Sequence, residues 1–317
     1  MITQKQHVSH AAFLISFTQI DNGYQLKNEH PPHDLTRQTI QHSQSWQIQT
    51  YLKIRQIVPK IARPFIEQWI YGIQKNSFSS YWSLGNDCLA ASILKEIGLR
   101  QCSGPFDWIA GLSYLDKLEL INNNFARFLN KDDLEYQDRK SPEGTIYVRN
   151  LYSNALFIHD FKDKSIDDFN KVANKYHRRQ SRFLSLIKET NILFLYIENT
   201  ENNFDYIKNI DSVIDFTQKV SDKIGVNHIS VILCTRHSHT NNFCEIYTKN
   251  NCSIFIQQFD RTIFKPGDWT PYSELNDLIK KALAIASKQQ NVMPKTENLG
   301  CKFRKSSSPN SFVKIND

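Results

Sequence analysis

Short apolar runs alternate with amphipathic stretches in the second half of the chain. Residues 191–197 (NILFLYI), 228–234 (HISVILC) and 252–258 (CSIFIQQ) have the length and composition of buried strands. Residues 166–187 and 204–224 carry apolar side chains at helical spacing, and each stretch precedes one of the first two runs. Buried strands separated by helices are typical of parallel sheets with βαβ crossovers. The pattern therefore predicts an α/β fold.

A strand, a helix and a hairpin are predicted before this region. Residues 81–84 form a short apolar strand pattern, and residues 88–97 form an amphipathic helix pattern that stops at Gly98. Residues 145–152 and 155–161 are two strand patterns joined at Ser153-Asn154, a link short enough for an antiparallel hairpin. We therefore expect a mixed, mainly parallel sheet flanked by helices, with a hairpin and an irregular N-terminal extension.

The two ends of the chain show weaker patterns. Residues 1–45 are rich in Gln, His, Asn and Ser, whereas six apolar residues between Ile54 and Ile73 recur at helical spacing, with Pro64 expected to kink or restart the helix. Residues beyond 288 are polar. We predict a partly helical extension (1–80), an α/β domain (81–288) and a disordered basic tail (289–317).

Composition narrows the classes of partner and location. The chain is 40% hydrophobic and 22% charged, as globular proteins are, and its net charge of +7 lies in the two flanks. A near-neutral main domain gives no reason to expect nucleic acid. Six cysteines without a CxxC pair disfavour a disulfide scaffold, so we expect a reducing, cytoplasmic location. We predict neither a signal peptide nor a membrane span.

The first candidate for chemistry is a cysteine at a predicted helix start. In the run Ser83-Leu84-Gly85-Asn86-Asp87-Cys88, Gly85 permits a sharp turn, Asn86 is a suitable N-cap and Cys88 follows in the first helical turn. Unpaired N–H groups and the helix dipole lower the pKa of a thiol there, and the same N–H groups can bind an oxyanion, with Asn86 in support. The alternative is a buried, inert cysteine.

An imidazole partner for the thiol is sought among ten histidines. His159 lies near the end of the strand at 156–161, a rigid position for a base. Alternation places Asp160 on the opposite face unless the strand ends or bulges there, so Asp107 is the freer candidate to orient the imidazole. A structural histidine is an equally weighted interpretation of His159.

Other signals are weaker. Arg178 and Arg182 share a helix face that could hold a phosphate or a sugar carboxylate, although a solvated basic face is the better interpretation. His237 and His239 lie in a predicted polar loop without partners at metal-ligand spacing. No phosphate loop, GxSxG or HExxH pattern occurs, so we expect neither a metal nor a cofactor.

Several of these segments together resemble a bacterial family of unknown function described as putative papain-like cysteine peptidases. The resemblance rests on Ser83-Leu84-Gly85 with Cys88, on Leu99-Arg100, on the run SGPFDW at 103–108 and on HDF at 159–161, and it covers about residues 80–270. It implies that Cys88 is the nucleophile and that His159 is the base.

Three hypotheses follow for function. The first is a thiol-dependent hydrolase or acyl transferase in which His159 deprotonates Cys88 and Asp107 or Asp160 holds the imidazole; its substrate is unknown, with peptide or glycan-linked carbonyls as candidates. The second is a non-catalytic or transferase protein of surface-polysaccharide biosynthesis that binds a sugar intermediate. The third is a binding module with a degenerate site.

Overall fold

The computed structural model describes residues 46–85, 88–198, 205–237, 244–260, 274–292 and 313–315. The chain divides into two compact units, residues 1–46 and residues 47–317. The fold described below is that of the second unit. The domain boundaries expected from sequence stay predictions.

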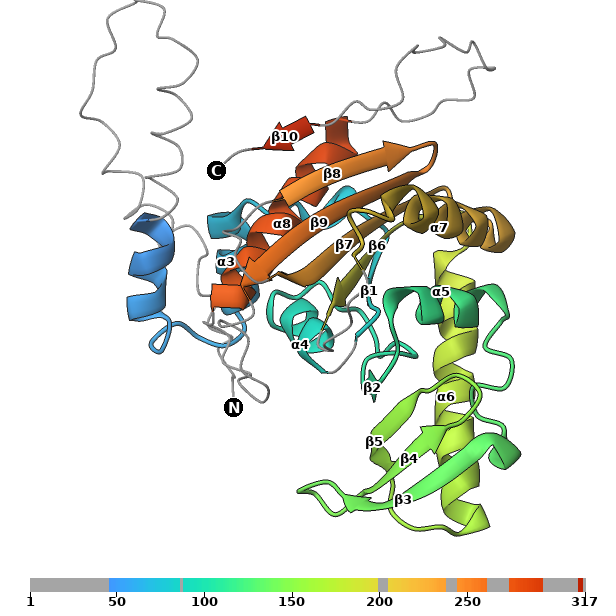
Figure 1. Cartoon of the computed structure of the whole chain (residues 1–317). Coiled ribbons are helices and arrows are strands. Elements are labelled where there is room, and N and C mark those ends of the chain that lie inside the picture. The colour runs from blue at the N-terminus through green and yellow to red at the C-terminus, as the bar shows by residue number, and fades with distance from the viewer. Residues whose placement is uncertain are drawn as a thin grey trace, which may run out of the picture. The chain divides into compact units, whose positions relative to one another are not determined.

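The larger sheet is mixed and mainly parallel, as predicted (Figure 1). Among the described residues its strand order is β1-β6-β7-β9-β8-β10. The parallel strands are β1 (Ser80–Ser83), β6 (Asn191–Ile197), β7 (His228–His237) and β9 (Cys252–Asp260). The antiparallel strands are β8 (Cys244–Lys249) and β10 (Val313–Ile315). The continuous apolar runs thus form the buried centre of the sheet.

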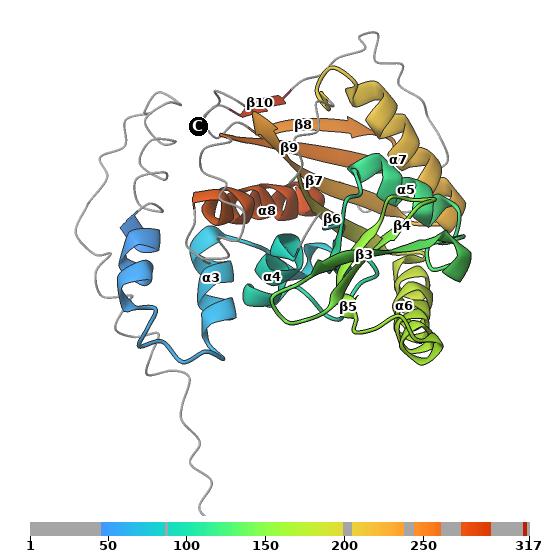
Figure 2. The ribbon, with the colours of Figure 1, turned by 60° about the horizontal axis from the view of Figure 1, so that its bottom comes forward.

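Helices cover both faces of this sheet (Figure 2). One face is covered by α3 (Arg63–Tyr71), α4 (Leu89–Glu96) and α8 (Glu274–Val292). The other face is covered by α5 (Tyr114–Asn122), α6 (Ile166–Ile187) and α7 (Ile210–Ile224). Strand β6 supplies both cores, because Phe194 and Tyr196 point to the second face while Leu193 and Leu195 point to the first. The strand therefore joins two separate hydrophobic clusters.

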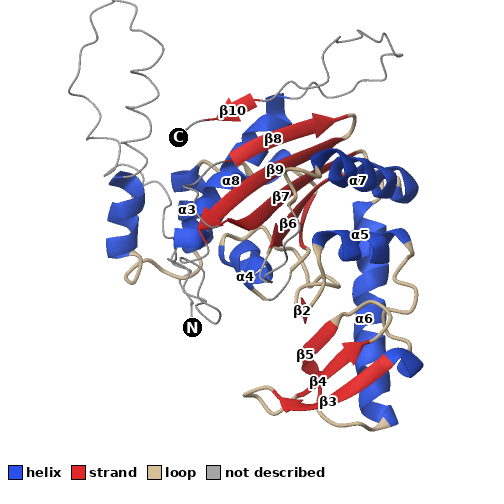
Figure 3. Ribbon diagram, viewed as in Figure 1, coloured by secondary structure: helices blue, strands red, loops and turns tan. Residues whose placement is uncertain are grey.

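A smaller antiparallel sheet lies within residues 88–198, beside α6 (Figure 3). Its order is β2 (Ile109–Ala110), β5 (Leu156–Phe161), β4 (Ile146–Asn150) and β3 (Leu134–Lys140). The predicted hairpin is β4–β5, and its turn contains Asn154 with a left-handed φ of 61°. The ring of Phe157 packs edge-on against Tyr176 of α6, with centroids 5.4 Å apart. Aromatic contacts thus fix this sheet to the helix.

Strand β5 contains an irregularity at the predicted base. The β4–β5 register shifts between the pairs Ile146↔Phe161 and Val148↔Phe157. Phe157 and Phe161 are both buried, whereas the side chain of His159 between them is 40% exposed. The strand therefore has the bulge that was the stated exception to simple alternation, and this bulge rotates the intervening residues.

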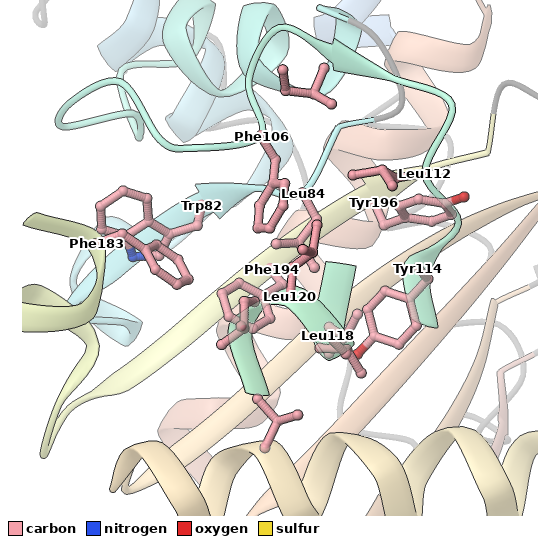
Figure 4. Packing of buried hydrophobic residues seen from close by; sticks show 14 of the residues in the cluster. Trp82, Leu84, Phe106, Leu112, Tyr114, Leu118, Leu120, Phe183, Phe194 and Tyr196 are labelled. Carbon is pink, nitrogen blue, oxygen red and sulfur yellow. The ribbon is translucent and has the colours of Figure 1, made fainter. Parts of the chain in front are cut away.

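The loop after α4 ties the two sheets to α6 through aromatic packing. Trp82 of β1 meets Phe183 of α6 edge-on at 4.9 Å, and Figure 4 shows Leu84 between Phe106 and Phe194. All five side chains are buried in one cluster. The strand that leads toward Cys88 is thus held rigidly along its apolar face.

Candidate active site

Cys88 lies at the start of α4, directly beyond the first strand. The Leu84 N–H donates to the Leu195 carbonyl (2.9 Å), and Gly85 then turns the chain with a left-handed φ of 52°. Cys88 is the N-cap residue, and its carbonyl accepts from the Ser92 N–H (2.9 Å). The helix therefore begins later than the sequence predicted, and Asn86, the expected cap, lies outside the described residues. The Cys88 side chain is half-buried.

The position of Cys88 in the topology has a known chemical meaning. Strands β1 and β6 are parallel neighbours, with Ser83 opposite Leu195. Helix α4 leaves β1 on one face of the sheet, and α7 leaves β6 on the other. In open α/β sheets, ligands bind outside the carboxyl ends of strands at such a switch point. Cys88 thus stands where this fold class places its ligands.

A buried lysine supports the turn before Cys88. Lys117 of α5 is fully buried, and its Nζ donates to the carbonyls of Leu112 (2.8 Å) and Gly85. The ammonium also lies 4.5 Å from the ring centroid of Tyr196, which Figure 4 shows beside Leu112. Burying an ammonium is costly unless it is well paired. The contact with Gly85 therefore places the positive charge of Lys117 at the turn that precedes Cys88.

Further buried polar groups gather at the carboxyl end of β6. Glu198 is the first residue after the strand, it is buried, and its N–H donates to the Cys234 carbonyl (2.8 Å). Burial raises the pKa of the Tyr196 and Tyr206 phenols, and the nearby Glu198 carboxylate adds to both rises. Both phenols are therefore protonated at neutral pH. Sequence reasoning missed Glu198, although a carboxylate directly after a buried parallel strand was a usable signal.

Asp107, the carboxylate expected to orient the imidazole, has partners within its own loop. Its buried carboxylate accepts from Arg100 Nε (3.0 Å), from Arg100 Nη2 and from the Gly104 N–H (2.9 Å). Burial raises the pKa of Asp107 against the opposing effect of Arg100. Arg182 of α6 donates to the Ser103 carbonyl (2.6 Å) of the same loop. The SGPFDW run is therefore held by two arginines, one on each side.

His159 and Asp160 lie on the smaller sheet. The His159 ring meets Trp108 edge-on (6.2 Å between centroids), and its Nδ1 is 3.7 Å from Glu143 Oε2. Asp160 accepts from the Tyr176 hydroxyl (2.8 Å) and pairs with Lys175. The structure thus gathers Asp107, His159 and Asp160 around β2 and β5. Cys88 follows β1 of the larger sheet.

A second histidine lies at the same end of the parallel strands as Cys88. His237, predicted to lie in a loop, is instead the last residue of β7, opposite Asp260 of β9. Strand β7 is the neighbour of β6, and Cys234 pairs with Ile197 at the end of β6. The structure describes the register of His237 and not its side chain. His237 is therefore at the carboxyl end of β7, and Cys88 follows the carboxyl end of β1, at the same end of the parallel strands.

Comparison with known proteins identifies a family and a viral relative. A family model described as "Putative papain-like cysteine peptidase" matches residues 79–240, from the residue before β1 to just beyond β7. "Uncharacterized protein R408" of Acanthamoeba polyphaga mimivirus is 28% identical over 179 residues, which cover 51% of this chain and 79% of that protein. No solved structure is detectably similar to the chain. A bacterial origin stays a prediction, since this relative is viral.

Proposed function

The chain belongs to the family of putative papain-like cysteine peptidases, and from this membership we propose that it is a thiol hydrolase whose nucleophile is Cys88. The family match contains three cysteines. Cys234 is buried inside β7, and Cys102 lies in the loop that follows α4. Cys88 alone among these three follows the carboxyl end of a parallel strand at a helix start. This placement at the switch point is the observation that carries the proposal.

The proposed reaction begins with proton transfer from the Cys88 thiol to an imidazole. The thiolate attacks a substrate carbonyl, and N–H groups of the first α4 turn stabilise the oxyanion that forms. The imidazolium returns its proton to the leaving group, and a thioester remains on Cys88. Water then hydrolyses the thioester, whereas another acyl acceptor would make the same sequence a transfer. The proposed substrates carry a peptide carbonyl or a glycan-linked carbonyl.

Two histidines compete for the role of base. His159 is the base that the family resemblance implies, and its bulged position turns the ring outward toward Glu143. His237 is the rival, because its strand ends at the same edge of the larger sheet as Cys88. Either histidine can be replaced while the other is kept. The two proposals are therefore separable by experiment.

Site-resolved alkylation by iodoacetamide tests the nucleophile. Cys88 and Cys102 are both half-buried, so exposure alone predicts similar rates. A low-pKa thiol at a helix start is mostly thiolate at neutral pH, so we expect Cys88 to react at least about tenfold faster than Cys102 at pH 7. Cys252 serves as a silent reference, because burial raises its pKa to about 12. Equal rates at Cys88 and Cys102, read by peptide mass spectrometry, would reject an activated Cys88.

The variants His159→Ala and His237→Ala identify the base. Loss of the true base abolishes the fast alkylation of Cys88 near neutral pH and moves its pH profile toward that of an ordinary thiol. The other variant leaves the profile unchanged. Circular dichroism confirms that each variant is folded. If neither change moves the profile, the Cys–His mechanism is wrong, whatever the reactivity of Cys88.

A further inference from the structure

A row of large apolar side chains lies exposed on α3 and on the turn before it. Ile57 and Ile61 are each 82% exposed, and Phe65 and Trp69 are each 66% exposed. The four residues are spaced by four, so Phe65 and Trp69 lie one helical turn apart on one face of α3. Exposed apolar residues usually occur singly, so four of them between Ile57 and Trp69 indicate a candidate interaction surface.

The opposite face of α3 is anchored in the protein. Glu67 is fully buried and is 2.9 Å from Lys280 of α8, measured from Oε2 to Nζ. Its Oε1 accepts from the Tyr51 hydroxyl (3.0 Å) and from Arg55 Nε (3.1 Å). Turning α3 to bury the apolar row would pull this carboxylate away from its cations, at a cost of several kcal/mol. The row therefore faces outward because the ion pairs fix the other face inward.

The exposed charges within this stretch of the chain have one sign. Within residues 47–76 the exposed charged side chains are those of Lys53, Lys60 and Lys75. The sole acidic residue of this stretch is the buried Glu67. A two-fold contact between copies would bring the same lysines together without a carboxylate from this stretch to pair with them. The surface therefore favours a partner that is apolar beneath and anionic at its rim.

We infer that this face docks on the surface of a bilayer that contains anionic lipids. Indole, phenyl and aliphatic side chains enter the headgroup boundary, while flanking lysines pair with lipid phosphates. No described helix is long and apolar enough to cross a membrane, so the contact is peripheral. The face lies before residues 79–240, so it is an addition to the family domain and does not depend on the proposed thiol chemistry.

Sedimentation of the full chain with vesicles tests the inference. Vesicles of phosphatidylcholine and phosphatidylglycerol are compared with vesicles of phosphatidylcholine alone, at low and high salt. We expect binding to the mixed vesicles that weakens as salt rises. The double variant Phe65→Asp/Trp69→Asp should bind at least about tenfold more weakly. The matched control is Ile166→Asp/Leu186→Asp, which changes two exposed apolar residues of α6 and should leave binding intact.

Lysine variants separate the electrostatic part. Each of Lys53→Gln and Lys60→Gln should weaken binding to the mixed vesicles about fivefold, whereas Lys140→Gln on β3 should not. The inference is overturned if both vesicle types bind equally, or if the Phe65/Trp69 variant binds as the wild type does. It is also overturned if the wild type ignores vesicles while the same variant turns an oligomer into a monomer in gel filtration. That last result would assign the face to contacts between copies.

Discussion

At the scale of single residues, the candidate site depends on a buried cation as much as on the cysteine. Lys117 donates to the Gly85 carbonyl and to the Leu112 carbonyl, so it both holds the turn and brings positive charge to it. A nearby positive charge lowers the pKa of a thiol. Asp87, whose charge opposes thiolate formation, makes such a cation necessary on chemical grounds. We therefore propose Lys117 as a positioning residue of this site.

Replacing Lys117 tests this role. Lys117→Met should raise the apparent pKa for Cys88 alkylation by about one unit, because the stabilising charge is lost. Lys117→Arg should restore the profile, since the charge remains. The control is Lys223→Met on α7, which removes an exposed lysine that also donates to a carbonyl, that of Asn122. A Lys117→Met protein that is folded, with an unchanged profile, would leave Lys117 a purely structural residue.

The burial of His228 leads to a prediction for the pH dependence of stability. It is buried at the start of β7, and burial lowers its pKa to about 4 from the ordinary 6.5. Well above pH 6.5 the imidazole is neutral in the folded and the unfolded state, so it does not lower the free energy of unfolding. As pH falls toward 4, only the unfolded chain takes up the proton, and the free energy of unfolding falls by roughly 2–3 kcal/mol. Urea denaturation at about pH 7 and pH 4.5 should show this loss in the wild type.

The variant His228→Gln isolates the contribution of this histidine. It cannot titrate, so its stability should fall less than that of the wild type between the same two pH values. The difference between the two losses should be roughly 2–3 kcal/mol. Identical losses would mean that folding leaves the pKa of His228 near its ordinary value.

Residue-level prediction from the sequence succeeded where local backbone chemistry decides the position. Gly85 marked the turn before Cys88, and the structure has that turn with Cys88 at the helix start. Lys117 gave no signal, because a lysine in an amphipathic helix pattern is normally solvated. His159 was expected on a regular strand face unless the strand ended or bulged, and the bulge that turns it outward depends on pairing with β4. The local sequence pattern does not specify how two strands pair.

At the scale of elements, a buried carboxylate joins α3 to its neighbours. Glu67 joins α3 to Lys280 of α8 and to Arg55 of the preceding turn, all in buried or half-buried surroundings. Glu67→Ala leaves Arg55 and Lys280 with Glu96 as their remaining carboxylate partner, so unfolding should become easier by about 2 kcal/mol in urea. Glu189→Ala, which removes an exposed carboxylate near Lys188, should change stability by less than about 0.5 kcal/mol. Equal, small effects would contradict the assigned role of Glu67.

Elements with strong periodicity were predicted with accurate bounds. Strand β6 was predicted at 191–197 and is Asn191–Ile197. Strand β3 was missed, because its residues LEYQDRK lie at a sheet edge with only partial burial and so carry little apolar alternation. Helix α7 begins six residues later than predicted. The Asp205 carboxylate accepts from the Ile207 and Lys208 N–H groups, which forms a turn in place of helix.

At the scale of the whole molecule, the larger sheet lies between two hydrophobic cores, and we predict that they unfold together. Phe194 faces the cluster under α5, α6 and α7, and Leu195, the next residue, faces the cluster under α3, α4 and α8. The hydrogen-bonded backbone of the sheet lies between the two clusters and supports both. Loss of packing on either face should therefore weaken both.

Core truncations on the two faces test this coupling. Phe194→Ala and Leu195→Ala should each lower the free energy of unfolding by about 3–5 kcal/mol. Each variant should still unfold in a single urea transition that coincides when followed by tryptophan fluorescence and by far-ultraviolet circular dichroism. Leu186→Ala, at an exposed apolar position of α6, should change stability by less than about 0.5 kcal/mol. Two separated transitions in either core variant would show that the faces unfold independently, and the switch point between β1 and β6 would then lack the rigid support that a site at Cys88 requires.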